Sequence, residues 1–461
     1  MRWGKWLKPH SKKYKVYKMQ KKLHLISLGC TKNLVDSEVM LGKLSDYENT
    51  QEINEADVII VNTCGFIEAA KKESIQTLLE ALETKKQGAI LVASGCLSER
   101  YAKELKEEIP ELDIITGVGD YDKIDKMIEE RKKGERILSN AKGVFLANET
   151  NKRIISGSKI HAYIKLSEGC NQKCSFCAIP SFKGKLHSRT LQSTLKEVRN
   201  LASEGYSDFT FISQDSSSYL RDLGIKDGLV ELISGIEDLA KEGVNIKSAR
   251  ILYLYPSTTS KKLIQKIIDS PIFHNYFDMP LQHASQKVLK TMGRSGEFME
   301  LLEMMRKAPN SFVRTSFILG HPGEGEEEFD ELCQLVENFS FDRINFFAYS
   351  KEEGTKSATM EQIPSKTIHS RLKKINKIFT QQYQQNLKKL KGAEITALIE
   401  GKSKEHEFFY AGRELRFAPE IDGEILINDK TIDEEITSGY YKVKITEIAG
   451  ENILGCVIGK A

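Results

Sequence analysis

Residues 162–177 have the sequence AYIKLSEGCNQKCSFC, an apolar run followed at once by a cysteine-rich loop. Cys170, Cys174 and Cys177 are separated by three and then two residues. Three thiolates on one short loop can bind three corners of a cubane iron–sulfur cluster, and without a fourth cysteine nearby one iron stays open for a small ligand. The alternative is a zinc site, which usually takes four protein ligands in pairs, and the second pair is missing here.

The run at 162–167 is the first of six strand candidates that alternate with helical patterns. The others lie at 208–213, 249–254, 276–281, 312–319 and 343–350. This alternation predicts a partial β/α barrel, shorter than the eight-stranded form. The cysteine loop then follows the first barrel strand at its carboxyl end, where the active sites of such barrels are built.

A second strand–helix series precedes the barrel. Strands are expected at 23–29, 57–62, 89–94 and 112–116, with helices between them at 35–44 and 66–82, which predicts an open α/β sheet. Cys30, Cys64 and Cys96 each follow one of the first three strands, and each has a glycine neighbour. Because the carboxyl ends of parallel strands line one crevice, we expect the three cysteines to converge on a second cluster. The alternative is three unrelated buried cysteines.

A third pattern follows a Lys- and Gln-rich helix expected at about 366–391. Five short runs without helical spacing predict a small five-stranded barrel of the oligonucleotide-binding sort. The domains expected are a disordered basic tail at 1–22, an N-terminal domain at 23–142, a core at 156–387 and the small barrel at 390–461. The polar stretch at 133–157 is interpreted as a linker.

Composition limits the class of protein. The 461 residues are 40% hydrophobic and 29% charged, and no stretch has the length of uninterrupted apolar sequence that a membrane span needs. The formal net charge is +3, but nine Lys and Arg residues and no acid stand in the first 22 positions, so the remainder is acidic at −6. That balance argues against a large nucleic-acid footprint. Without a secretory signal, a disulfide framework among the eight cysteines is not expected; in a cytoplasmic protein, cysteines in clusters more often bind metal or do chemistry.

The motifs together resemble the radical S-adenosylmethionine methylthiotransferases. The resemblance covers about residues 23–458 and rests on GCNQKCSFC (169–177), SLGCTKNLVDSE (27–38), NTCGFIEAA (62–70), SGCLSERY (94–101), CAIPSFKGKLHSR (177–189), DMPLQHAS (278–285), ILGHPGEGEEEF (318–329) and APEIDG (418–423). Within the family, the chain is similar to the branch that modifies an aspartate of small-subunit ribosomal protein twelve. The branch that acts on tRNA tends to have Gln–Met–Asn after the first cysteine, whereas Thr31–Asn33 here is Thr–Lys–Asn.

The resemblance implies a fold, cofactors and partners. It implies a radical SAM barrel with a TRAM-like β-barrel at the C-terminus, S-adenosylmethionine as cofactor and two 4Fe-4S clusters. One cluster would lie on Cys170, Cys174 and Cys177 and cleave the cofactor; the other would lie on Cys30, Cys64 and Cys96 and hold the sulfur to be methylated. The implied reaction is methylthiolation of the β-carbon of an aspartate. It needs an electron donor such as flavodoxin or ferredoxin and a sulfur source, with no membrane and no primary role for nucleic acid.

Several single residues are assigned more weakly. Phe176, Gln214 and Ile318 are candidates for contacts with the cofactor, while Asp215 and His283 stand at strand ends as functional or structural groups. Cys333 and Cys456 are expected in the core, and Glu324–Glu328 at a solvated helix start. Two other functions stay open: the same chemistry on a tRNA adenosine beside the anticodon, and an iron–sulfur carrier without enzymatic activity. A basic face on the small barrel, formed by Lys402, Lys404, Arg413 and Arg416, would favour tRNA.

Overall fold

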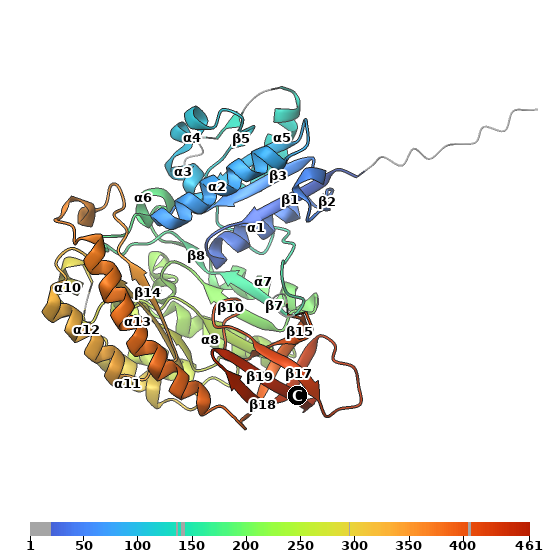
Figure 1. The fold of residues 1–461 in the computed structure, drawn as a ribbon. Helices are drawn as coiled ribbons and strands as arrows, with labels where there is room; N and C mark the ends of the chain where they lie inside the picture. Colours follow the sequence, from blue (N-terminus) through green and yellow to red (C-terminus); the bar gives the residue numbers. More distant parts are fainter. Residues whose placement is uncertain (1–19, 135–136, 140–142, 295, 404–406) are drawn as a thin grey trace, which may run out of the picture.

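The structure is a computed structural model that describes residues 20–461 except 135–136, 140–142, 295 and 404–406. It contains an N-terminal α/β domain, a central arc of parallel strands and a small C-terminal barrel that packs beside the arc (Figure 1). The predicted basic tail, up to residue 19, lies outside the described residues. Among those that are described, no helix has the length and apolar character needed to cross a membrane.

The N-terminal domain is a parallel sheet with helices on both faces. Its strand order is β2-β1-β3-β4-β5-β6. Buried side chains alternate between the faces: Ile60 and Val92 pack with helices α1 and α5, while Ile59 and Leu91 pack with α2 and α4. The bounds are β1 Lys22–Ser27, α1 Thr31–Lys43, β2 Glu48–Asn49, β3 Val58–Thr63, α2 Glu68–Thr84, β4 Ile90–Gly95, α3 Cys96–Arg100, α4 Ala102–Glu108, β5 Ile114–Ile115, α5 Ile124–Lys132 and β6 Ile137–Leu138.

The segment interpreted as a linker is part of the packed structure. Ile137 and Leu138 form the edge strand β6, which pairs with β5. Further along, the Arg153 guanidinium is buried between two carboxylates, 2.6 Å from that of Glu38 in α1 and paired with Glu197 of the central domain. At Arg153 the polar character of this stretch therefore reflects buried ion pairs between domains, which composition alone cannot distinguish from a solvated linker.

The central domain forms an open arc of parallel strands, as predicted. Sheets β11-β10-β7 and β12-β13-β14 are joined by a parallel bridge between Ala249 and Phe273. Its apolar side chains form one large core with the surrounding helices. The bounds are β7 His161–Lys165, β8 Ser167–Glu168, α6 Ile179–Lys183, β9 His187–Ser188, α7 Leu191–Ser203, β10 Asp208–Ile212, α8 Gly228–Lys241, β11 Ser248–Ile251, α9 Lys261–Ile268, β12 Tyr276–Asp278, α10 Gln286–Thr291, α11 Met299–Lys307, β13 Phe312–Leu319, α12 Glu326–Asn338, β14 Arg343–Ala348 and α13 Ser365–Lys388.

The C-terminal module is a closed five-stranded barrel, also as predicted. Its order is β15-β16-β17-β19-β18, with bounds β15 Glu394–Lys402, β16 Tyr410–Glu414, β17 Ile425–Lys430, β18 Gly439–Ala449 and β19 Asn452–Lys460. Arg413 is buried rather than displayed, because its guanidinium lies 2.5 Å from the carboxylate of Asp208 in the central domain. Arg416 pairs with Glu414, and Lys404 lies outside the described residues. Two residues of the predicted basic face, Arg413 and Arg416, are therefore held by carboxylates, whereas Lys402 is exposed and lies over the Tyr410 ring.

Three of the weaker assignments concern α12 and the two remaining cysteines. Cys333 and Cys456 are buried, as predicted. Helix α12 does begin with three acidic residues, but the expectation of a solvated start is wrong at both ends of the run: Glu328 is buried, and so is Glu324. Its carboxylate lies 2.7 Å from the Arg371 guanidinium and accepts from the Gly320 amide at 2.9 Å. The carboxylate thus ties helix α13 to the end of β13.

Candidate active site

The loop with Cys170, Cys174 and Cys177 leaves the barrel after β7 and β8 and runs into α6. Gly169 starts it with a φ of +76°, and a Cβ atom there would lie 2.2 Å from the Lys185 carbonyl oxygen, so only glycine fits. The amide of Cys170 donates to the Gly184 carbonyl at 3.1 Å, and that of Ser175 donates to the Met292 carbonyl at 2.9 Å. These backbone bonds anchor the loop at Cys170 and at Ser175.

Hydrogen-bond donors surround these sulfurs. The Gln172 amide lies 3.4 Å from Cys170 Sγ, and Arg294 donates to Cys174 Sγ at 3.5 Å. Tyr255 Oη lies 3.6 Å from the same sulfur. Burial raises the pKa of Cys170 to about 11 and that of Cys177 to about 12, so the free thiols hold their protons at neutral pH. Donors aimed at sulfur stabilise the thiolate form that binds metal, so this loop suits an anionic, metal-bound state.

The second set of cysteines lies at the carboxyl ends of β1, β3 and β4, as the strand pattern predicted. Cys30 directly precedes α1, Cys64 follows β3 and Cys96 begins α3. A Cβ atom on Gly29 would lie 2.8 Å from Cys64 Sγ, which shows how closely the first two loops approach. In a doubly wound sheet this edge is the ligand-binding crevice. The structure therefore brings the three cysteine loops together.

Asn33 ties these loops to one another, a role that sequence reasoning missed. Its side-chain amide donates to the carbonyls of Leu28 at 3.0 Å and Thr63 at 3.2 Å, and its Oδ1 accepts from Cys96 Sγ at 3.7 Å. Burial raises the pKa of Cys64 and raises that of Cys96 to about 12. The sequence did offer one sign of this role, because Asn33 follows Cys30 by only three residues.

Neither cysteine set has the geometry of a single-ion site. Among the described residues, no three Cys, His, Asp or Glu side chains converge closely enough to hold one metal ion. A 4Fe-4S cluster takes its thiolates on different irons, so its ligands need not converge on a single point.

The three candidate cofactor contacts lie on the same face of the barrel. Phe176 is half-buried and meets His321 edge-on, with 6.1 Å between ring centroids. Gln214 follows β10 and donates to the Glu168 carboxylate, while its own Oε1 is buried without a partner in the described structure. Ile318 is half-buried on β13. Each of the three residues thus stands on the side of the barrel where the strands end.

Asp215 and His283 have structural partners. The Asp215 carboxylate accepts from Gln172 at 2.7 Å and from the Ser218 hydroxyl at 2.6 Å, so it holds the cysteine loop against the end of β10. His283 Nδ1 accepts from the Ser285 amide at 3.0 Å, and its Nε2 lies 3.3 Å from the Glu324 carboxylate. Both residues position the strand ends.

Buried ion pairs join the two cysteine-bearing domains. Lys165 of β7 pairs with Asp36 of α1 and, at 2.7 Å, with Glu168. Lys183 of α6 lies 3.3 Å from Glu168 and 3.8 Å from Asp36. All four side chains are at most 4% exposed. Sequence reasoning missed this cluster because Asp36 is far along the chain from the other three residues.

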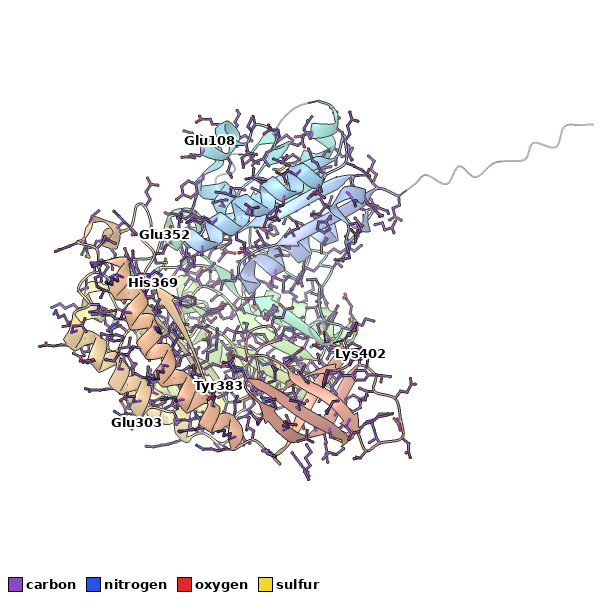
Figure 2. All side chains as sticks on the ribbon, in the orientation of Figure 1. Glu108, Glu303, Glu352, His369, Tyr383 and Lys402 are labelled. Atoms are coloured by element: carbon purple, nitrogen blue, oxygen red, sulfur yellow. The ribbon has the colours of Figure 1, made fainter. Side chains whose placement is uncertain are left out.

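A second junction between the N-terminal and central domains lies beside the loops of Cys64 and Cys96. Glu352, in the loop after β14, lies 3.1 Å from the Arg100 guanidinium and 3.2 Å from the Lys71 ammonium, at the meeting of the two domains (Figure 2). Arg100 also donates to the carbonyl of Gly65, next to Cys64, at 2.5 Å. The carboxylate of Glu352 thus fixes the cysteine loops relative to the barrel.

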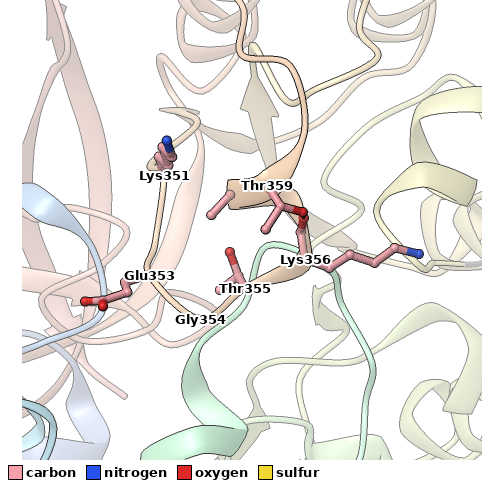
Figure 3. A pocket seen from close by; sticks show the side chains of 7 residues that line it. Lys351, Glu353, Gly354, Thr355, Lys356 and Thr359 are labelled. Atoms are coloured by element: carbon pink, nitrogen blue, oxygen red, sulfur yellow. The ribbon is translucent and has the colours of Figure 1, made fainter.

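The loop at 351–359 also lines a surface hollow (Figure 3). The charged side chains of Lys351, Glu353 and Lys356 point in different directions there, so no group of catalytic residues converges. A second cavity, of about 630 Å³, lies where all three domains meet. It is lined by six acidic residues against three Lys and Arg residues, and it lies near the amino-terminal ends of the barrel strands, at His161.

Known families match each of the three modules. Residues 22–117 match the uncharacterized protein family UPF0004, residues 164–336 the radical SAM superfamily and residues 392–458 the TRAM domain. The solved structure of the radical S-adenosylmethionine methyltransferase TsrM from Kitasatospora setae aligns with a TM-score of 0.52 at 15% identity, over 71% of this chain and 75% of that one. It supports the fold. The parallel barrel and its three-cysteine loop therefore define a radical SAM enzyme.

Curated relatives specify the family. The chain is 62% identical to the ribosomal protein uS12 methylthiotransferase RimO of Wolinella succinogenes, over 95% of this chain and 98% of that protein. It is 57% identical to the protein of the same name from Helicobacter hepaticus, over 95% and 98%. The chain belongs to the RimO family of ribosomal protein uS12 methylthiotransferases. The resemblance identified from the motifs is confirmed.

Proposed function

We propose that this enzyme methylthiolates the β-carbon of an aspartate in ribosomal protein uS12, in the cytoplasm. The observation that carries the proposal is the placement of two three-cysteine sets in two domains joined by buried ion pairs. One reaction with two iron–sulfur centres needs such a fixed arrangement. The relatives that share most of this sequence are named for the same activity.

Cys170, Cys174 and Cys177 would hold the first 4Fe-4S cluster, with S-adenosylmethionine on the open iron. Bound together, cluster and cofactor supply reductive cleavage that generates a carbon-centred radical able to abstract hydrogen. Arg294 and Tyr255 would stabilise the charge on the Cys174 thiolate. Phe176, Gln214 and Ile318 would line the cofactor site and exclude water from it, since all three lie partly buried on this face.

Cys30, Cys64 and Cys96 would hold the second 4Fe-4S cluster, which carries the sulfur to be methylated and transferred. Gly29 lets two of these loops approach, and Asn33 bonds to all three. An electron donor such as flavodoxin or ferredoxin and a separate sulfur source complete the reaction.

Charge favours a basic protein over RNA as the macromolecular substrate. From Ala393 onward the chain carries 14 acidic residues and eight Lys and Arg residues. The acid-rich cavity where the domains meet has the same sign. Such surfaces attract a basic protein and repel phosphate. Burial of Arg413 further weakens the tRNA alternative, and a carrier would have no need of a barrel with a cofactor-binding face.

The test is a reaction with both substrates. The anaerobically reconstituted protein, with reductant and S-adenosylmethionine, is incubated separately with uS12 and with tRNA. Mass spectrometry should find a methylthio group on an aspartate of uS12 and none on tRNA. Product on tRNA alone would assign the chain to the other branch, and cofactor cleavage in neither reaction would support the carrier.

A further inference from the structure

The segment that follows β11 contacts the loop of Cys174 and the start of α1 beside Cys30 through two alternate residues, Tyr255 and Tyr253. Tyr255 Oη lies 3.6 Å from Cys174 Sγ. Two residues earlier, the ring of Tyr253 lies under the Lys32 ammonium, with 3.7 Å between Nζ and the ring centroid. Lys32 is itself two residues from Cys30. The Lys32–Tyr253 pair therefore marks the gap between the two cysteine sets.

Lys32 differs from the other lysines in this region. Lys165 and Lys183 face the carboxylates of Asp36 and Glu168. In the described part of the chain, no carboxylate lies within 4.0 Å of the Lys32 ammonium. Lys32 also stands in the first turn of α1, where the helix dipole disfavours a cation. Because the Lys32 ammonium has no carboxylate partner at this unfavourable position, we expect it to bind an anionic ligand.

Tyr253 is held in an uncommon backbone conformation. Its φ is +63°, in the left-handed region that residues other than glycine seldom adopt. The Tyr253 amide donates to the Asp278 carboxylate at 3.0 Å, and its carbonyl accepts from the Ser216 amide at 3.0 Å. Strained residues fixed in this way concentrate at functional sites. Tyr253 and Lys32 are each partly exposed as whole residues.

We propose that Lys32, seated on the ring of Tyr253, binds the carboxylate of the substrate aspartate. The ammonium has three donors, so it can keep its contact with the ring while it donates to a carboxylate. The β-carbon adjoins that carboxylate and would then lie between the two cysteine sets. The pair would select an acidic side chain over a neutral one. This inference rests on the proposed function and extends it to the residue that recognises the substrate.

The test couples two substitutions. Binding of uS12 to the reconstituted enzyme is measured with each uS12 aspartate replaced in turn by asparagine, for the wild type and for Lys32→Met. For one aspartate, the replacement should weaken binding to the wild type by about tenfold, the scale of a hydrogen bond to a charged group, and should not affect binding to Lys32→Met. Lys32→Arg should retain most of the preference. Lys43→Met, at the exposed far end of α1, is the matched control.

Each outcome has one meaning. If the wild type does not methylthiolate uS12, the proposed function fails. If it does, and Lys32→Met still distinguishes aspartate from asparagine as the wild type does, the inference fails alone. Should Lys32→Met not fold, lysine acetylation of the wild type replaces it: uS12 should protect Lys32, and the asparagine variant of the target should protect it several-fold less. Equal protection by both proteins would overturn the inference.

Discussion

Glu352 offers a quantitative test of the junction between the two domains. Its carboxylate is 3% exposed and pairs with Arg100 and Lys71 at 3.1 and 3.2 Å. Removing one partner of a buried ion pair costs about 3–5 kcal/mol, because the other charge is left unpaired. Arg100 keeps its bond to the Gly65 carbonyl and Lys71 is 15% exposed, so we expect the lower end, about 3 kcal/mol, for Glu352→Gln.

Urea unfolding of the iron-free protein measures this loss. Glu353→Gln is the matched control, because Glu353 is next to Glu352 in the chain but is exposed and makes no ion pair in the described structure. For this control we expect the free energy of unfolding to change by no more than about 0.5 kcal/mol. Because Glu352 fixes the loops of Cys64 and Cys96 rather than the barrel, Glu352→Gln should reduce methylthio transfer and preserve cofactor cleavage. Unfolding curves that coincide for the two variants would refute this account of the junction.

Four further predictions address the clusters, the partner and pH. Replacing Cys170, Cys174 and Cys177 with alanine should halve the iron content and abolish S-adenosylmethionine cleavage; retained cleavage would contradict the assignment. Alanine at Cys30, Cys64 and Cys96 should preserve cleavage but stop methylthio transfer, and labelled product from this variant would show the second set to be dispensable. Replacing three exposed acidic residues of the C-terminal barrel with lysine should lower the capture of uS12 several-fold and raise the binding of tRNA. These residues are Glu407, Asp433 and Glu435, and the control Glu303→Lys on α11 should change neither. Burial lowers the pKa of His274 to about 3, so its protonation opposes folding. The free energy of unfolding should decline as pH falls from about 6.5, with a contribution from His274 of at most about 1.4 kcal/mol per pH unit, and His274→Gln should flatten that slope in urea titrations.

Local patterns predicted the features on which the site depends. Short apolar runs bounded by glycine predicted the strands that end at Cys30, Cys64 and Cys96, because the buried strands of a parallel sheet are apolar on both faces. The same reasoning placed the loop of Cys170 at the end of the first barrel strand. The residues between strand and cysteine, Gly29 and Gly95, have the positive φ that such turns need.

Contacts between distant residues could not be predicted in this way. Lys165 pairs with Asp36, 129 positions away, and no local pattern predicts that pairing. The two-residue strand β6 is too short to show periodicity. Glu324 carries a charge and follows a turn, so its sequence context predicts exposure, yet Arg371 from another helix makes burial possible. The strand expected at 249–254 ends at Ile251, before Tyr253 turns into the left-handed region.

The central claim is that this enzyme modifies an aspartate of uS12. It is tested most directly by mass spectrometry of ribosomal proteins and tRNA from otherwise identical cells with and without the gene. We predict that uS12 carries one methylthio group on a single aspartate only when the gene is present, while tRNA methylthiolation is the same in both. An unmodified uS12 in cells that contain the gene, together with methylthiolated tRNA that disappears when the gene is removed, would contradict the account.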